Sequence, residues 1–233
     1  MVLVAVKEHK TVKHRTFLNS CTSYRKYYIC GMARIQTNKE VSRKDVILKA
    51  SAALFREKGY KAASMRDLAV KVGVEAASLY NHIRSKAELL HDICFDVANI
   101  FTENITEVEA SGGSPIAKLE KLLRFNIRQM TDNFEEVFVA DREWRYLSEP
   151  YLSNYQNQRR IYRRRFAAII EDGIKRGEIN NIDASTTVLI LLHAVSGIES
   201  WHRSKQRISA EQLEENMLTI FIEGLKRSSA AEK

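Results

Sequence analysis

The chain of 233 residues contains only nine glycines and two prolines. Because β-rich chains need turn residues after every strand or two, this scarcity favours helices. No stretch shows the alternating pattern of a half-buried strand, and no internal repeat is visible. The composition, 45% hydrophobic and 28% charged, is that of an ordinary globular protein. The sequence therefore predicts an all-α fold.

Cysteine is also scarce, and its three copies lie at Cys21, Cys30 and Cys94. An odd number without metal-ligand spacing indicates neither a disulfide framework nor a thiolate metal site. We expect free thiols in a reducing cytoplasm, with no metal and no cofactor.

Long hydrophobic runs are missing. The longest, residues 188–192, is far shorter than the roughly 20 residues that cross a bilayer. The apolar stretch at residues 2–6 is too short for the core of a signal peptide. We expect a soluble protein that has no membrane partner.

The common catalytic motifs are absent as well. The chain has no glycine-rich phosphate loop, no nucleophile elbow and no metal-binding histidine pair. His91, His193 and His202 are scattered and have no convincing Cys or Ser partner. These absences predict a binding protein and not an enzyme.

Positive charge is concentrated at the N-terminus. Residues 1–45 hold ten Lys and Arg against three acids, which accounts for seven of the eight net positive charges. This basicity is typical either of a nucleic-acid partner or of a solvated basic tail. Residues 1–31 show no sustained period, so we expect a disordered or mis-assigned extension, with Met32 as an alternative start.

A clear helical period begins after Ser42, and we expect Ser42, Ser64 and Ser85 to cap helices that begin after them, while Gly59 and Gly73 end helices. The clearest linker is at residues 111–115. The predicted helices cover residues 43–58, 65–71, 75–83, 86–108, 116–131, 134–147, 151–177, 184–204 and 210–226. We assign residues 32–88 to a three-helix DNA-binding domain and residues 89–228 to a helical ligand-binding and dimerisation domain.

Residues 64–82 have the pattern of a helix-turn-helix. Two short helices that cross steeply need a small residue at the contact, a glycine in the turn and apolar residues facing inward. Ala69, Gly73, Val74 and Leu79 meet these needs. The alternative is an αα-hairpin inside a helical bundle.

The same region is similar to the TetR/AcrR family of regulators. The likeness lies in residues 47–60 (ILKASAALFREKGY), 64–69 (SMRDLA), 73–74 (GV), 78–83 (SLYNHI) and 85–90 (SKAELL). Two positions depart from the family pattern. Ile83 replaces a usual aromatic residue, and two alanines begin the recognition helix, which leaves the base preference open.

The resemblance implies a homodimer that binds double-stranded DNA at a near-palindromic operator. Phosphate contacts position such a protein, and base-edge contacts specify the sequence. The residues implied as phosphate contacts are Ser64, Tyr80, His82 and Lys86. Those implied at base edges are Ala77 and Ser78.

The two last predicted helices carry more apolar residues than one core-facing stripe needs. In this family such helices pair across a two-fold axis. The candidate interface residues are Leu192, Val195, Leu213, Met217 and Phe221. The alternative is burial within one protomer.

Five arginines fall within residues 159–165. They form either a solvated basic face or a site for an anionic ligand. This half is similar to family members that respond to acyl-CoA, which implies an acyl-CoA of fatty-acid or related catabolism as the effector. The candidate ligand residues are Trp144, Arg159, Tyr162, Arg163, Phe166 and Trp201. The expected function is a repressor that a ligand releases from its operator, and the alternative is a helical protein-interaction module without DNA binding.

Overall fold

Three of the first four helices begin after serines that cap their N-termini. The computed structural model describes residues 42–204 and 207–227, so the expectations for residues 1–31 lie outside the described residues. The helices are α1 (Arg43–Lys58), α2 (Met65–Val72), α3 (Ala76–Leu79) and α4 (Lys86–Ala110). The hydroxyls of Ser42, Ser64 and Ser85 accept backbone N–H bonds from the first turns of α1, α2 and α4.

A glycine makes the tight turn between α2 and α3. Gly73 has φ 74° and ψ 35°, the left-handed conformation that glycine adopts without steric cost. Its N–H bonds to the carbonyls of Ala69 and Val70 and so closes α2. The sequence placed the turn correctly. The recognition helix is shorter than predicted, because the chain leaves α3 after Leu79 in a turn in which the N–H of His82 bonds to the Leu79 carbonyl.

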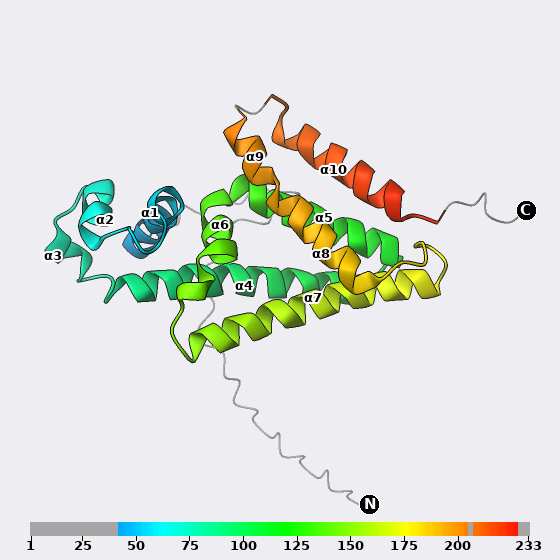
Figure 1. Ribbon diagram of the computed structural model, residues 1–233, viewed down its shortest axis with the longest axis horizontal. Helices are drawn as coiled ribbons and strands as arrows, with labels where there is room; N and C mark the ends of the chain where they lie inside the picture. The colour runs from blue at the N-terminus through cyan, green and yellow to red at the C-terminus, as the bar shows by residue number, and fades with distance from the viewer. Residues whose placement is uncertain (1–41, 205–206, 228–233) are drawn as a thin grey trace, which may run out of the picture. The chain divides into compact units, whose positions relative to one another are not determined.

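The remaining helices complete an all-α fold (Figure 1). They are α5 (Pro115–Asp132), α6 (Phe134–Arg142), the 3₁₀ turn η1 (Trp144–Tyr146), α7 (Tyr151–Lys175), α8 (Ala184–Ser196), α9 (Ile198–Arg203) and α10 (Ala210–Leu225). Among the described residues the one β-type pairing is an isolated bridge between Ile179 and Lys226.

Two predicted helices are divided. The segment predicted at 134–147 leaves the α-helix after Arg142 and tightens into η1. The segment predicted at 184–204 breaks at Gly197, whose N–H is shared between the carbonyls of His193 and Ala194.

Two apolar cores lie along α4. The first joins α1–α3 to the beginning of α4 and also takes in Val139, Leu147 and Tyr155. The second joins the end of α4 to α5–α10. All described residues belong to one compact unit, Lys39–Lys233, and the predicted domain boundary after residue 88 falls inside α4. The segment predicted to bind DNA therefore shares both a helix and a core with the rest of the chain.

Paired buried carboxylates fix the last helices. Glu214 on α10 lies between Arg124 and Arg128 of α5. Glu199 on α9 pairs with Arg142 of α6. Moving α9 or α10 away from its neighbour would leave a buried carboxylate unpaired, which is strongly destabilising. Each ion pair therefore holds its helix in place.

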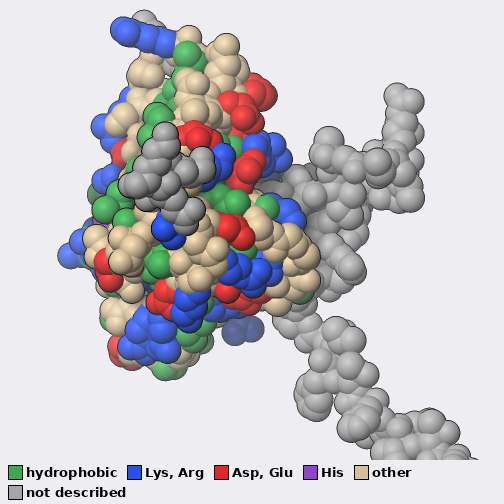
Figure 2. All heavy atoms as spheres, turned by 90° about the vertical axis from the view of Figure 1, so that its right-hand side faces the viewer, with side chains coloured by type: hydrophobic (Ala, Val, Ile, Leu, Met, Phe, Trp, Pro, Cys, Tyr) green, Lys and Arg blue, Asp and Glu red, His purple; other side chains and the backbone are tan. Residues whose placement is uncertain are grey.

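The described surface mixes both signs of charge. Figure 2 shows acidic and basic side chains interspersed over the face that it presents. No described helix is long and apolar enough to cross a membrane. No group of three metal-binding side chains occurs within residues 42–204 and 207–227. Cys94 is a buried free thiol, and burial raises its pKa to about 12.

Candidate nucleic-acid interface and ligand cavity

The helix-turn-helix presents the short helix α3 to solvent. Leu79 is buried and anchors it to the first core. Ala77, Tyr80 and His82 are exposed, and Ser78 is half-buried. Tyr80 is 54% exposed, and its side chain and that of His82 make no hydrogen bond with any described residue. These two side chains are therefore available to an external partner.

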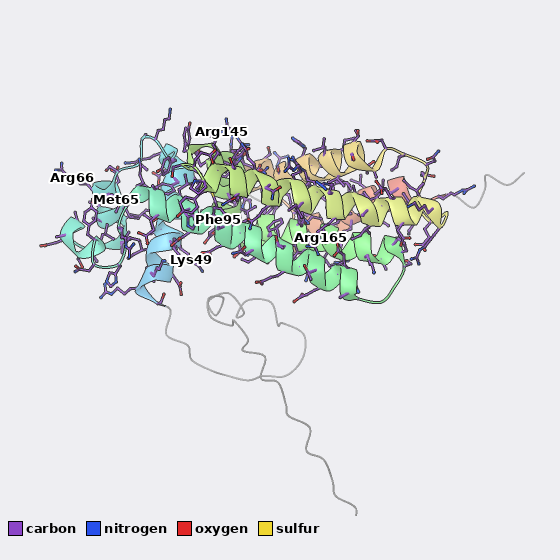
Figure 3. All side chains as sticks on the ribbon, turned by 90° about the horizontal axis from the view of Figure 1, so that it is seen from below. Lys49, Met65, Arg66, Phe95, Arg145 and Arg165 are labelled. Carbon is purple, nitrogen blue, oxygen red and sulfur yellow. The ribbon has the colours of Figure 1, made fainter. Side chains whose placement is uncertain are left out.

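The structure gives Ser64 a capping role at the start of α2. Its hydroxyl accepts from the N–H of Asp67 at 3.1 Å and donates to the Asp67 carboxylate at 2.6 Å. Hydrogen bonds from Lys58 and then from Ser64 hold the pKa of Asp67 well below its usual range. Because the hydroxyl proton of Ser64 is already bound within the protein, the side chain cannot donate to a phosphate without giving up its bond to the Asp67 carboxylate. The backbone N–H groups that open α2, at Met65 and Arg66 (Figure 3), are the donors left at this helix end.

Replacing Ser64 by alanine is expected to lower the free energy of unfolding by about 1 kcal/mol, because the N-cap bond is lost. Chemical denaturation measures this change, and Ser64→Thr is the control that keeps a hydroxyl. If Ser64→Ala lost operator binding while keeping its stability, the hydroxyl would instead be a DNA contact.

The structure corrects the role of Lys86. Its ammonium donates to the backbone carbonyls of Tyr60, Lys61 and Ala63 at 2.9, 3.2 and 2.8 Å. It also lies 4.6 Å from the centre of the Tyr60 ring. An ammonium has three protons, and all three are used here. Lys86 therefore holds the turn between α1 and α2 and has no proton left for a phosphate.

A cavity of about 430 Å³ lies between α4, α5, α6, η1, α7 and α8. Apolar side chains such as Val97, Phe101, Met130 and Val137 form much of its wall. Polar groups from α5 and α7 interrupt that wall at Asn126, Gln158 and Tyr162. A largely apolar cavity with a few placed polar groups is the usual form of a small-molecule site.

The cavity wall is rich in arginine. Arg159, Tyr162 and Arg163, three of the residues singled out in the sequence, line it. Arg142 and Arg145 join them from α6 and η1, a convergence that no pattern in the sequence indicates. The lining contains four arginines and a single carboxylate, Asp141.

The four arginines differ in how they are held. Arg159 pairs with Asp141 at 2.8 Å and lies over the ring of Trp144. Arg142 pairs with Glu199. Arg145 has no ion pair with a described residue, but it donates to the backbone carbonyl of Arg142 at 3.1 Å. Arg163 makes neither an ion pair nor a hydrogen bond with any described residue. Arg163 is therefore the arginine most readily available to an anion.

Three of the predicted ligand residues do not line the cavity. Phe166 is fully buried in the second core, with its ring against that of Tyr162. Trp144 packs against the first core. The indole N–H of Trp201 donates to the carbonyl of Ile208 at 3.1 Å. Large aromatic side chains here fill the bundle, so predicting them as ligand contacts was wrong for this cavity.

The rest of the arginine run also points elsewhere. Arg165 binds Glu109 on α4 at 2.6 Å, and Figure 3 shows it well along the molecule from Arg145. Arg160 donates to Asn157 on its own helix. Only the i, i+4 pair Arg159 and Arg163 shares the cavity-facing side of α7.

The predicted dimer residues face mostly inward. Val195 is 4% exposed and belongs to the second core, which corrects its assignment to an interface. Leu192 lines the cavity. The three residues predicted on α10 are half-buried against the same core: Leu213, Met217 and Phe221. The apolar side chains that α8 and α10 expose are Leu189, Ile190 and Ile220, at 41%, 62% and 70%.

Two family models match the chain in order. The model described as "Bacterial regulatory proteins, tetR family" covers residues 47–93, and the model described as "Tetracyclin repressor-like, C-terminal domain" covers residues 112–225. The chain belongs to the TetR family. It is a DNA-binding transcriptional regulator with an N-terminal helix-turn-helix, as the sequence predicted.

Relatives in the TetR family match over most of the chain. The transcriptional repressor KstR2 of Mycolicibacterium smegmatis is 23% identical over 84% of this chain and 97% of its own length. The structure of the ketosteroid regulator KstR2 of Mycobacterium tuberculosis aligns with a TM-score of 0.74 at 23% identity, over 83% of this chain and 98% of that one. The structure of AibR with isovaleryl coenzyme A and operator DNA aligns with a TM-score of 0.68 at 24% identity, over 77% and 97%.

Proposed function

We propose that this regulator is a homodimeric repressor that leaves its operator when a coenzyme A thioester occupies the cavity. The observation that carries the proposal is the convergence of four arginines and one carboxylate on a largely apolar cavity. Arginine suits phosphate because its planar guanidinium donates paired hydrogen bonds. The coenzyme A phosphates would bind the arginines, and the acyl group would enter the apolar part.

A relative supports this class of ligand. AibR, which shares the fold, has been solved with isovaleryl coenzyme A and operator DNA together. Release in this chain requires the ligand to bind better to a conformation that fits the operator poorly.

Helix α6 offers a route for that coupling. Its C-terminal residue Arg142 lines the cavity. At its other end, the ring of Phe134 lies 5.5 Å from the guanidinium of Arg56 on α1, and Glu135 pairs with the same arginine at 3.6 Å. A ligand that draws Arg142 toward its phosphates would pull on a helix that also contacts the DNA-binding segment.

On the DNA side, we propose that Tyr80 and His82 bind backbone phosphates, because both side chains are exposed and free of internal hydrogen bonds. Ala77 and Ser78 would lie against base edges.

Replacing Arg163 by methionine is expected to weaken binding of an acyl-CoA about tenfold, because a charge-assisted hydrogen bond is lost. Calorimetry with hexanoyl-CoA measures the change. Arg164→Met is the matched control, since Arg164 is exposed on the same helix and does not line the cavity. If both variants bound hexanoyl-CoA like the wild type, or if only uncharged hydrophobic compounds bound, the thioester proposal would be wrong.

A further inference from the structure

One buried oxygen in the cavity wall lacks a partner. The side-chain oxygen Oε1 of Gln158 is inaccessible to solvent and accepts no hydrogen bond from the described residues. Gln158 lies on α7 and lines the cavity. A buried acceptor left unpaired is destabilising, so such groups normally find a donor. Because Gln158 is one of the residues that line the cavity, a turn of its side chain about its own bonds would bring this oxygen to a ligand that supplies the donor.

One turn further along α7, the buried hydroxyl of Tyr162 is a hydrogen-bond donor, and its contact with Asn126 of α5 shows why. The side-chain nitrogen of Asn126 donates to the carbonyl of Leu122 at 2.7 Å and to the hydroxyl oxygen of Tyr162 at 2.8 Å. The Leu122 carbonyl can only accept, which fixes the orientation of the Asn126 amide. The Tyr162 oxygen is therefore an acceptor in this pair, and its own proton is bound to no described residue. Burial raises the pKa of Tyr162, which keeps that proton in place.

Gln158 and Tyr162 are four residues apart and share one face of α7. Their neighbours Arg159 and Arg163 form the adjacent stripe of the same helix. The cavity thus has a charged stripe for phosphates beside a neutral stripe that offers one acceptor and one donor. An unsubstituted hydrocarbon chain would leave both neutral groups unpaired.

We propose that the acyl group of the ligand carries a hydroxyl that hydrogen-bonds to this neutral stripe, donating to Gln158 and accepting from Tyr162. A hydroxyl is the simple substituent that both donates and accepts. A ketone can only accept, so it would satisfy Tyr162 and leave Gln158 unpaired. This inference rests on the proposed thioester function and narrows it to hydroxyacyl thioesters.

The test compares hexanoyl-CoA with hexanoyl-CoA molecules hydroxylated or oxidised to a ketone at successive carbons. Calorimetry on the full chain is expected to show that the best hydroxylated thioester binds about tenfold or more tightly than the unsubstituted one, with the ketones between them. Gln158→Met and Tyr162→Phe should each lose most of this preference. Gln156→Met is the matched control, since Gln156 is exposed on the same helix and does not line the cavity.

Three results would overturn the inference. Equal affinity for the unsubstituted thioester and every hydroxylated one would show that the cavity does not recognise a hydroxyl on the acyl group. The proposed thioester function would still stand. A preference that survives both Gln158→Met and Tyr162→Phe would place the hydroxyl elsewhere. If no thioester bound at all, the proposed function and this inference would fail together. Thermal melting of each variant shows that the loss is not one of folding.

Discussion

Replacing Ile190 by glutamate is expected to give a monomer that no longer holds its operator. Ile190 on α8 and Ile220 on α10 are 62% and 70% exposed, and large apolar side chains at such exposure indicate a partner surface. A glutamate buried at a dimer contact would be unpaired and strongly destabilising. A dimer bound to two half-sites has roughly a hundredfold or more higher operator affinity than a monomer bound to one. Operator affinity should therefore fall by that order.

Ile161→Glu is the matched control for the dimer surface. Ile161 is also exposed, at 41%, but it lies on α7 and not on α8 or α10. Light scattering should show dimers for the wild type and for Ile161→Glu, and monomers for Ile190→Glu. A monomeric wild type, or a dimeric Ile190→Glu that binds the operator normally, would contradict this interface.

Replacing Lys86 by methionine is expected to lower the free energy of unfolding by about 2–3 kcal/mol, since three charge-assisted bonds to the turn after α1 are lost. Operator affinity should fall as well, because that turn leads into α2. The slope of log affinity against log salt should stay unchanged, since Lys86 neutralises no phosphate.

Lys86→Arg separates the two roles of this residue. An arginine keeps the positive charge, but its planar guanidinium does not reproduce the bonds of an ammonium to three carbonyls. It should therefore lose stability nearly as Lys86→Met does. If Lys86→Arg bound the operator normally while Lys86→Met reduced the salt slope by about one unit, Lys86 would be a phosphate contact after all.

Local signals in the sequence were enough to predict most of the fold. Ser42, Ser64 and Ser85 cap the helices that they were predicted to cap. These are contacts between residues three apart, so the sequence contains them directly. The breaks after Arg142 and at Gly197 were missed, because tertiary packing interrupts a helical pattern that continues in the sequence.

The site depends on contacts that the sequence does not show. Arg142 and Arg145 reach the cavity only because α6 and η1 pack beside α7. Nothing in the local pattern distinguished Val195, which is buried, from Ile190, which is exposed, since both are apolar residues of one helix. The role of Lys86 depends on a turn more than twenty residues away. Side-chain direction and long-range packing decide the position of these arginines, the burial of these apolar residues and the role of Lys86. Residue type and spacing do not.

The most direct test of the account is a thermodynamic cycle between ligand and operator. Fluorescence anisotropy of labelled operator is measured without and with saturating hexanoyl-CoA and the hydroxylated thioesters, and calorimetry measures each thioester with and without operator. We predict that the thioester weakens operator binding and that the operator weakens thioester binding by the same factor. Arg163→Met should need about tenfold more thioester for the same release. Operator affinity that is unchanged at thioester saturation would contradict the claim that this cavity controls DNA binding.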